Sequence, residues 1–221
     1  DIALEDLIAE EDMVVTISHQ GYIKRIPIST YRRQHRGGRG LTGMGTKEED
    51  FVSRLFVAST HSYILFFTDF GRCYWLKVYE IPQGGRAARG RPIVNMLELQ
   101  KGEKIAAFLP VREFGEDLYV LMATRRGLVK KTALSQYSRP RRNGINAINI
   151  VEGDALISVE LTSGRQDILL QTRNGMAVRF NEQEIRPMGR TAQGVKGITL
   201  GKDDYVVGMV AVKRPDSTLL V

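Results

Sequence analysis

A pattern of about 50 residues recurs four times along this 221-residue chain, and such a tandem repeat limits the possible folds more than any other feature. Each copy has a β-branched run, a Ser/Thr-x-x-Gly turn and a second run. The turn glycines lie 50, 56 and 48 residues apart, at Gly21, Gly71, Gly127 and Gly175. A second glycine recurs at spacings of 50, 54 and 50, at Gly40, Gly90, Gly144 and Gly194. A third, strand-like run follows at 51–58, 105–111, 155–161 and 205–212.

The repeated runs favour β-strands. They are short, rich in Val, Ile, Leu, Phe and Tyr, and bounded by Gly, Asn, Asp and Ser. Asn174-Gly175 is the strongest hairpin signal, because glycine supplies the positive φ of a tight turn. Only residues 4–11 are compatible with a short helical turn. About four strands in each unit is typical of a propeller blade, so we predict an all-β, propeller-like fold of four-stranded blades.

The repeats also suggest how the chain is organised. We predict a lead-in segment at 1–12 and a β-domain at 13–221. Its repeats cover about 13–60, 61–112, 113–162 and 163–212, and residues 213–221 resemble the opening strand of a fifth repeat. Because a blade cut in mid-strand would leave an open sheet edge, we expect the chain to be an excerpt of a longer polypeptide.

Composition narrows the class of protein. The hydrophobic content of 43% is enough for a buried core, and 32 Lys and Arg against 25 Asp and Glu give a net charge of +7. Cys73 is the single cysteine, which excludes an internal disulfide and favours a reducing cytoplasm. The acidic first residues resemble no signal peptide, and no apolar run approaches the roughly 18 residues of a spanning helix. A cytoplasmic protein is therefore expected.

Positive charge is concentrated in four equivalent stretches, which we call the first to fourth basic loops. They span 30–40, 83–91, 137–144 and 186–196, and together hold 13 Lys or Arg and no Asp or Glu. Their basic residues are Arg32, Arg33, Arg36, Arg39, Arg86, Arg89, Arg91, Arg139, Arg141, Arg142, Arg186, Arg190 and Lys196. Equivalent loops of successive blades emerge on one rim, so we predict a continuous basic belt suited to a bent polyanion.

Further basic residues follow the hairpin turns. Four of them, Lys24, Arg25, Lys130 and Lys131, are included among the candidate DNA contacts, and the others are Arg72, Lys77 and Arg179. With no recognition helix or zinc finger in the sequence, we expect phosphate contact and DNA shape to dominate over base readout.

The sequence offers no sign of catalysis. It has no Ser/His/Asp set, P-loop or paired carboxylates above background, and His19, His35 and His61 share no metal-ligand spacing. We therefore expect no catalytic residue, no metal site and no cofactor in this chain. The aromatic residues Phe70, Tyr74 and Trp75 are assigned to the blade core rather than to base stacking, and Cys73 to a buried strand position.

The first basic loop contains the heptad Gln34-His35-Arg36-Gly37-Gly38-Arg39-Gly40. At six of seven positions it resembles the gyrase-A box, the Gln-basic-Arg-Gly-Gly-basic-Gly motif of DNA gyrase A subunits. His35 stands where that family has Arg or Lys, which weakens one positive charge near neutral pH. Residues 8–18, 21–25 and 40–44 are also similar, and the resemblance to the C-terminal, DNA-wrapping domain of that family spans the whole chain.

The resemblance implies a β-pinwheel whose blades exchange strands and wrap duplex DNA around a basic rim. It implies that this wrapping lets a type IIA topoisomerase introduce negative supercoils, and that the chain is a non-catalytic part of that enzyme. The catalytic tyrosine would lie outside this chain. Implied partners are double-stranded DNA, the gyrase B protein and a second copy of the gyrase A protein, with ATP and Mg²⁺ used elsewhere in the holoenzyme. The implied location is the nucleoid-associated bacterial cytoplasm.

Two alternatives remain open. One is the C-terminal domain of a topoisomerase IV-like subunit, whose version of the box is degenerate or absent. The other is a propeller-like protein-interaction scaffold with an incidentally basic rim. Steep salt dependence of duplex binding separates DNA binding from the scaffold, because each neutralised phosphate contributes a slope of about −0.9 to log K against log salt.

Overall fold

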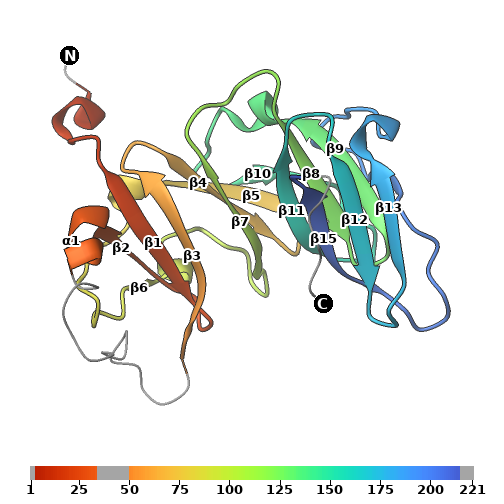
Figure 1. Ribbon diagram of the computed structural model, residues 1–221, viewed down its shortest axis with the longest axis horizontal. Coiled ribbons are helices and arrows are strands. Elements are labelled where there is room, and N and C mark those ends of the chain that lie inside the picture. Colours follow the sequence, from red (N-terminus) through yellow and green to blue (C-terminus); the bar gives the residue numbers. More distant parts are fainter. Residues whose placement is uncertain (1–2, 34–49, 215–221) are drawn as a thin grey trace. The chain divides into compact units, whose positions relative to one another are not determined.

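The computed structural model describes residues 3–33 and 50–214 (Figure 1). Within these ranges the chain forms short antiparallel strands, one six-residue α-helix and several 3₁₀ turns. The strands are β1 Asp12–Ser18, β2 Tyr22–Pro27, β3 Val52–Ser59, β4 Tyr63–Thr68, β5 Arg72–Lys77, β6 Arg91–Pro92, β7 Ile105–Val111, β8 Tyr119–Thr124, β9 Leu128–Ala133, β10 Ile145–Asn146, β11 Leu156–Thr162, β12 Asp167–Thr172, β13 Ala177–Asn181, β14 Val195–Lys196 and β15 Val206–Val212.

Each repeat contributes three strands to a sheet of its own, which confirms the all-β prediction. The sheet orders are β3-β1-β2-β6, β7-β4-β5-β10, β11-β8-β9-β14 and β15-β12-β13. The first two runs of a repeat form a hairpin, and the third run pairs with the first strand. Three of the sheets have four strands, and the fourth has three within the described residues.

The fourth strand of each four-stranded sheet comes from the following repeat. It is only two residues long, and it pairs at the same register each time: Ile23 with Arg91, Cys73 with Ile145, and Val129 with Val195. Adjacent blades therefore exchange a strand, as the resemblance implied. This exchange places the ends of the second, third and fourth basic loops on the edge of the preceding sheet.

The Ser/Thr-x-x-Gly turns have a common hydrogen-bond pattern. The turn glycines have positive φ, and the Ser or Thr hydroxyl accepts from the backbone N–H that follows the glycine. The hydroxyl–nitrogen distances are 3.1 Å for Ser18–Tyr22, 3.3 Å for Thr68–Arg72, 3.2 Å for Thr124–Leu128 and 3.1 Å for Thr172–Met176. The motif is thus a structural device that closes each hairpin.

The chain divides into two compact units, 1–64 with 75–99 and 110–113, and 65–74 with 100–109 and 114–221. In the first unit, every residue of β1 after Asp12 is buried. In the second, Leu121, Val129, Ile168 and Leu170 are among the residues that form a continuous apolar core between the last two sheets. Burial of these side chains supplies the main stabilisation of each unit.

Three local features refine the sequence expectations. The structure has a 3₁₀ turn, η1 Leu4–Leu7, within the segment expected to allow one, and an unpredicted helix, α1 Ile28–Arg33. Other repeats have 3₁₀ turns where the first has α1, namely η2 Val78–Glu80, η4 Leu134–Tyr137 and η5 Glu182–Glu184. The remaining 3₁₀ turn is η3 Ile93–Asn95. No helix in the described ranges is long and apolar enough to cross a membrane.

The core assignment of the aromatic residues is partly right. Tyr74 and Trp75 are buried, and so is Cys73. The assignment of Phe70 to the core is wrong, because its side chain is 44% exposed. Phe70 occupies the hairpin turn before Gly71 rather than a strand, and a turn position directs its side chain outward.

Candidate nucleic-acid interface

The second and fourth basic loops lie along the edges of the strands that precede them. In the first unit, Arg25 N–H donates to the Pro82 carbonyl at 3.0 Å, and Gly84 N–H donates to the Arg25 carbonyl at 3.1 Å. In the second unit, Met188 N–H donates to the Lys131 carbonyl at 2.8 Å. Arg25 and Lys131 occupy equivalent repeat positions. Backbone hydrogen bonds therefore fix the position of these two loops without any contribution from the arginine side chains.

The second recurrent glycine explains how a loop reaches the preceding sheet. Gly90, Gly144 and Gly194 all have positive φ. A Cβ on Gly194 would lie 2.5 Å from the Val129 carbonyl oxygen, and one on Gly144 would lie 2.8 Å from Tyr74 Cε1. Both the backbone conformation and the close approach thus require glycine where the chain passes onto the neighbouring strand.

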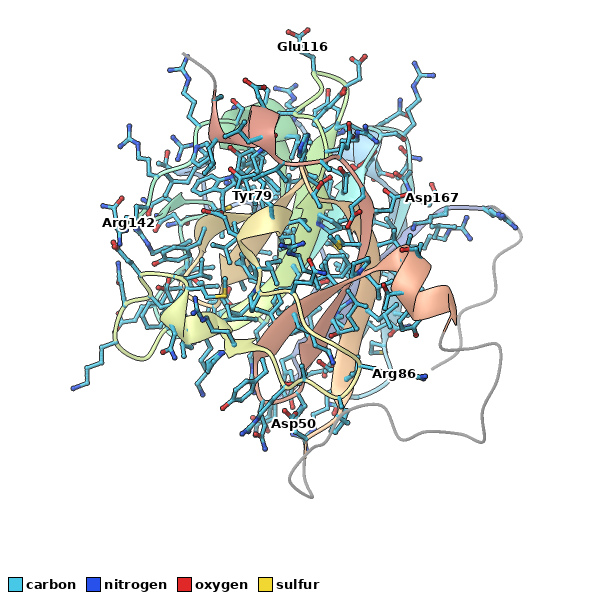
Figure 2. All side chains as sticks on the ribbon, turned by 90° about the vertical axis from the view of Figure 1, so that its left-hand side faces the viewer. Asp50, Tyr79, Arg86, Glu116, Arg142 and Asp167 are labelled. Carbon is cyan, nitrogen blue, oxygen red and sulfur yellow. The ribbon has the colours of Figure 1, made fainter. Side chains whose placement is uncertain are left out.

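Most basic side chains of the described loops are exposed. The exposed ones are Arg89, Arg91, Arg139, Arg141, Arg142, Arg186 and Lys196, and the half-buried ones are Arg86 and Arg190. In Figure 2, Arg142 lies at the outside of the ribbon with its side chain directed away from it. These side chains are accessible to a large ligand, which is the first requirement for a phosphate contact.

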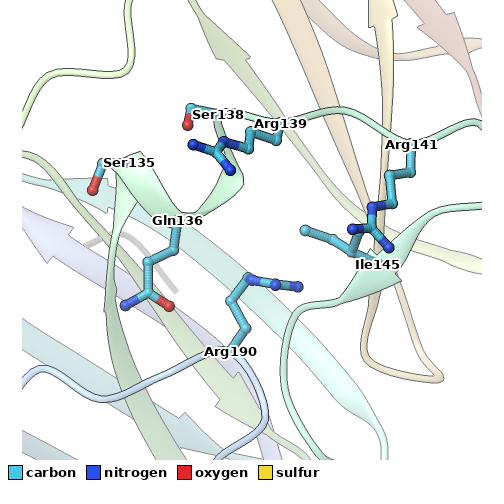
Figure 3. Close-up of a pocket in the computed structure, with 7 residues that line it drawn as sticks. All are labelled: Ser135, Gln136, Ser138, Arg139, Arg141, Ile145 and Arg190. Atoms are coloured by element: carbon cyan, nitrogen blue, oxygen red, sulfur yellow. The ribbon is translucent and has the colours of Figure 1, made fainter.

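The third and fourth basic loops meet at an open pocket of about 410 Å³ in the second unit (Figure 3). Arg139 and Arg141 approach from the third loop and Arg190 from the fourth. The remaining lining residues are Ser135, Gln136, Ser138 and Ile145. Arg190 Nη1 donates to the Asn146 carbonyl at 3.1 Å, which holds its guanidinium toward the third loop.

The composition of this lining indicates an anion site. It contains three guanidinium groups, two hydroxyls and an amide, and no carboxylate is among the residues that line it. Three like charges in one pocket repel each other, and an anion between them removes that cost. A phosphate group has enough acceptor oxygens for several guanidinium hydrogen bonds at once.

The belt prediction is supported locally. Within the second unit, the third and fourth basic loops adjoin at the pocket, and Asn149 N–H donates to the Ala192 carbonyl at 3.0 Å. A belt that continues through all four repeats stays a prediction. The box residues Gln34, His35, Arg36, Gly37, Gly38, Arg39 and Gly40 lie outside the described residues, as do the side chains of Arg32 and Arg33.

Three of the four predicted DNA contacts after the hairpin turns have a different role in the structure. Lys24, Lys130 and Lys131 are only 2%, 0% and 4% exposed, so these residues offer almost no surface to a duplex. Arg25 is half-buried, and its Nε donates to the Ile81 carbonyl at 2.6 Å. The assignment of the three lysines to phosphate binding is therefore contradicted, whereas a phosphate contact by the half-buried Arg25 stays a prediction. Lys24 and Lys130 fall on strands that the basic loop of the following repeat covers.

The buried lysines bind backbone carbonyls. Lys24 Nζ donates to Gly85, Arg86 and Ala88 at 3.1, 2.7 and 2.7 Å. Lys130 Nζ donates to Ala147, Gly189 and Arg190 at 2.5, 2.9 and 2.9 Å. Burial, and then the Arg190 guanidinium, lower the pKa of Lys130 to about 7. Burial and Arg86 also lower the pKa of Lys24.

Comparison with known proteins identifies the family. Residues 12–59, 62–112, 118–163 and 166–213 match the family described as "DNA gyrase C-terminal domain, beta-propeller". The chain belongs to this family. It is 53% identical over its full length to the DNA gyrase A protein of Salmonella typhimurium strain LT2, and 53% identical over 95% of its length to that of Staphylococcus aureus strain NCTC 8325. The chain spans about a quarter of each of these relatives, 25% and 24%.

Solved structures show the same fold. The C-terminal domain of DNA topoisomerase IV matches with a TM-score of 0.80 and 31% identity, covering 95% of this chain and 64% of that one. A DNA gyrase A C-terminal domain matches with a TM-score of 0.70 and 23% identity, covering 92% and 66%. The arrangement of the sheets described above is therefore that of a known fold.

Sequence reasoning missed several exposed residues of this gyrase C-terminal domain family member. Ser135, Gln136 and Ser138 line the pocket. Ser135 and Gln136 precede the third basic loop, Ser138 lies within it, and none of the three carries a charge that would mark it as a candidate. Arg125 and Arg126 are exposed on a hairpin turn, and Arg125 lies 4.0 Å from the Tyr205 ring centroid. The Thr-Arg-Arg-Gly turn of the third repeat was the available signal for this pair.

Proposed function

We propose that this chain binds and wraps duplex DNA as the C-terminal domain of a DNA gyrase A protein. The observation that carries the proposal is the set of exposed arginines on loops at equivalent repeat positions, with backbones fixed against neighbouring strands. Repeated, rigid and cationic loops suit a ligand with regularly spaced negative charge. Duplex DNA is such a ligand, with one phosphate per about 1.7 Å of helix axis.

The energetics favour many modest contacts over one strong site. Bending 20–30 base pairs through 40–90° costs on the order of 1–6 kcal/mol, so several phosphate contacts are needed to offset it. Phosphate contacts carry no sequence code, and the loops contribute guanidinium groups rather than a recognition helix. Wrapping should therefore depend on DNA charge and flexibility more than on base sequence.

The wider context is part of the same proposal. In a gyrase, wrapping by this domain would present a DNA segment for strand passage with a fixed sign of crossing and so support negative supercoiling. The gyrase B protein and a second gyrase A protein would join through the rest of the polypeptide, and ATP and Mg²⁺ would act there. The chain itself would be non-catalytic, in the nucleoid-associated bacterial cytoplasm. The 53% identity to gyrase A proteins supports this context.

A topology assay tests the proposal. The 221-residue chain is bound to nicked circular plasmid, the nick is ligated, and the linking-number change is read on a gel. A salt-sensitive positive shift is expected for a gyrase-type wrap. Binding without a shift would refute wrapping while leaving DNA binding intact, and absence of binding at low salt would favour the protein-interaction scaffold.

A topoisomerase IV-like subunit is the second candidate. The TM-score of 0.80 to a topoisomerase IV C-terminal domain favours it, whereas the box at 34–40 and the gyrase A relatives favour gyrase. The assay above discriminates between them, because a bent but unwrapped duplex changes the linking number little. A positive shift that disappears when the box is replaced by alanines would decide for gyrase.

A further inference from the structure

Lys24 and Lys130 occupy the same position in two repeats, three residues after the turn glycines Gly21 and Gly127. Each side chain runs beneath the basic loop of the following repeat. Lys24 binds the carbonyls of Gly85 and Arg86, and Lys130 binds those of Gly189 and Arg190. Gly85-Arg86 and Gly189-Arg190 lie at identical distances before Gly90 and Gly194. The same contact is therefore built twice, once in each unit.

The bound carbonyls belong to a β-turn. Ala88 N–H donates to the Gly85 carbonyl at 3.1 Å, and Ala192 N–H donates to the Gly189 carbonyl at 3.2 Å. These bonds between residues three apart define two equivalent turns, at 85–88 and 189–192. The arginine is the second residue of each turn. Lysine Nζ donates to the carbonyls of the first two residues of the turn. These hydrogen bonds fix the orientation of the arginine backbone.

The second repeat lacks this lysine, and the basic loop of the repeat that follows it lacks the Gly-Arg pair. Tyr74 stands at the equivalent position of the second repeat, and its hydroxyl donates to Glu103 Oε1 at 2.7 Å. The third basic loop has Arg139-Pro140 where the second and fourth basic loops have Gly-Arg. The lysine of one repeat and the Gly-Arg turn of the next are therefore present or absent together. This pattern indicates that the lysine serves the turn.

We propose that Lys24 and Lys130 are positioning residues that hold Arg86 and Arg190 in the orientation needed to bind a DNA phosphate. Lys130 is the stronger case, because Arg190 lines the arginine pocket and its guanidinium is also held by the Asn146 carbonyl. The buried amine itself makes no contact with DNA. This role rests on the proposed DNA-binding function.

A double-mutant cycle on duplex binding tests the proposal. Lys130→Met keeps the aliphatic side chain and removes Nζ, and Arg190→Ala removes the guanidinium. Each single change should weaken binding of a duplex of about 40 base pairs by about threefold to tenfold and make the slope of log K against log salt shallower by about 0.9, the value for one lost phosphate contact. The double variant should bind no more weakly than either single variant.

The other outcomes overturn the role. Independent, multiplied losses in the double variant would mean that Lys130 acts without Arg190, and unchanged binding by Lys130→Met would mean that Nζ serves stability alone. An Arg190→Ala variant with unchanged binding would instead refute the DNA site at the pocket, which separates failure of the proposed function from failure of positioning. Lys24→Met with Arg86→Ala repeats the cycle in the first unit and decides the question if Lys130→Met does not fold. Thermal unfolding of every variant checks the folded state.

Discussion

The backbone of Gly194 packs so closely against that of Val129 that a Cβ on the glycine would lie 2.5 Å from the Val129 carbonyl oxygen. This contact comes one residue before β14 pairs with β9, and the glycine has a φ of 95°. A recurrent glycine in the sequence is thus the point at which one repeat is joined to the sheet of the previous one. Strand exchange and the placement of the fourth basic loop depend on the same residue.

Substituting this glycine should cost more stability than substituting a glycine that only turns the chain. We expect Gly194→Ala to lower the free energy of unfolding by about 3 kcal/mol or more, because it adds a backbone clash to about 1–2 kcal/mol of left-handed strain. Gly175→Ala, with positive φ and an open Cβ direction, should show only the strain. Urea unfolding measures both.

Gly201→Ala is the matched control for this series. Gly201 has no heavy atom within 4 Å of the Cβ direction and is not among the positive-φ glycines. Its substitution should be close to neutral. Equal losses for Gly175→Ala and Gly194→Ala would mean that the contact with Val129 relaxes without cost and that glycine is used there only for its backbone conformation.

The repeat and its strands could be predicted because they depend on local signals. Short runs rich in β-branched and aromatic residues, turn glycines and Asn174-Gly175 all act within a few residues. Strand exchange could not be derived in this way, since β6, β10 and β14 have two residues each and no periodicity at all. It was anticipated only through the family resemblance, and the register became visible only in the structure.

The sequence predicted the exposed arginines of the basic loops correctly. It did not predict that Lys24 and Lys130 are buried. The arginines of the third basic loop are exposed because turn residues and Pro140 keep that segment off the sheet. Lys24 and Lys130 looked equally suitable by residue type, but both fall on strands that a later loop covers. A positive charge in the sequence does not show that a side chain is exposed, because a buried lysine can donate all its hydrogen bonds to backbone carbonyls.

The acidic residue before each third strand should contribute to turn stability. Asp154 Oδ1 accepts from Arg126 N–H at 2.9 Å and from Ala155 N–H at 2.8 Å, so one oxygen joins the hairpin turn to β11. Asp154→Ala should lower the free energy of unfolding by about 1–3 kcal/mol, because two amides lose their acceptor. Glu152→Ala, at an exposed position, is the control. Thermal unfolding that is identical for both variants would contradict this role.

The buried amine of Lys130 should make stability depend on pH. Its pKa is about 7 in the folded chain, against an ordinary value of 10.5, because burial and then Arg190 disfavour the charged form. Between pH 7 and 10.5 the unfolded chain binds more protons, so the contribution of this residue to the free energy of unfolding rises with pH. Below pH 7 both states are protonated and the contribution is constant.

Comparison with Lys130→Met isolates this contribution from other titrating groups. The difference in free energy of unfolding, wild type minus variant, should increase as the pH is raised from about 7 to about 10, as measured by urea unfolding at several pH values. Lys202→Met, at an exposed position, controls for the loss of an amine. A difference that stays flat, or that falls with pH, would mean that Lys130 remains protonated among its three carbonyls.

The arginine pocket should contribute to DNA affinity through charge. Arg141→Ala is expected to weaken duplex binding by about threefold to tenfold and to make the salt slope shallower by about 0.9, with little change between duplex sequences. Arg165→Ala, an exposed arginine outside the four basic loops, is the control. The two proteins are compared by fluorescence anisotropy between about 50 and 200 mM salt. An equal loss for Arg165→Ala would indicate a nonspecific effect of net charge rather than a site.

Replacement of the box by alanines, from Gln34 to Gly40, should separate wrapping from strand passage. In the complete gyrase-type enzyme, we expect supercoiling to be lost and relaxation to be retained, because the catalytic tyrosine would lie elsewhere. His35→Arg should act in the opposite direction, since it adds a full positive charge at neutral pH and strengthens salt-sensitive DNA binding. Plasmid topology on gels measures both activities, with Lys101→Ala as a surface control. Unchanged supercoiling after box replacement would show that the described basic loops wrap DNA without the first one.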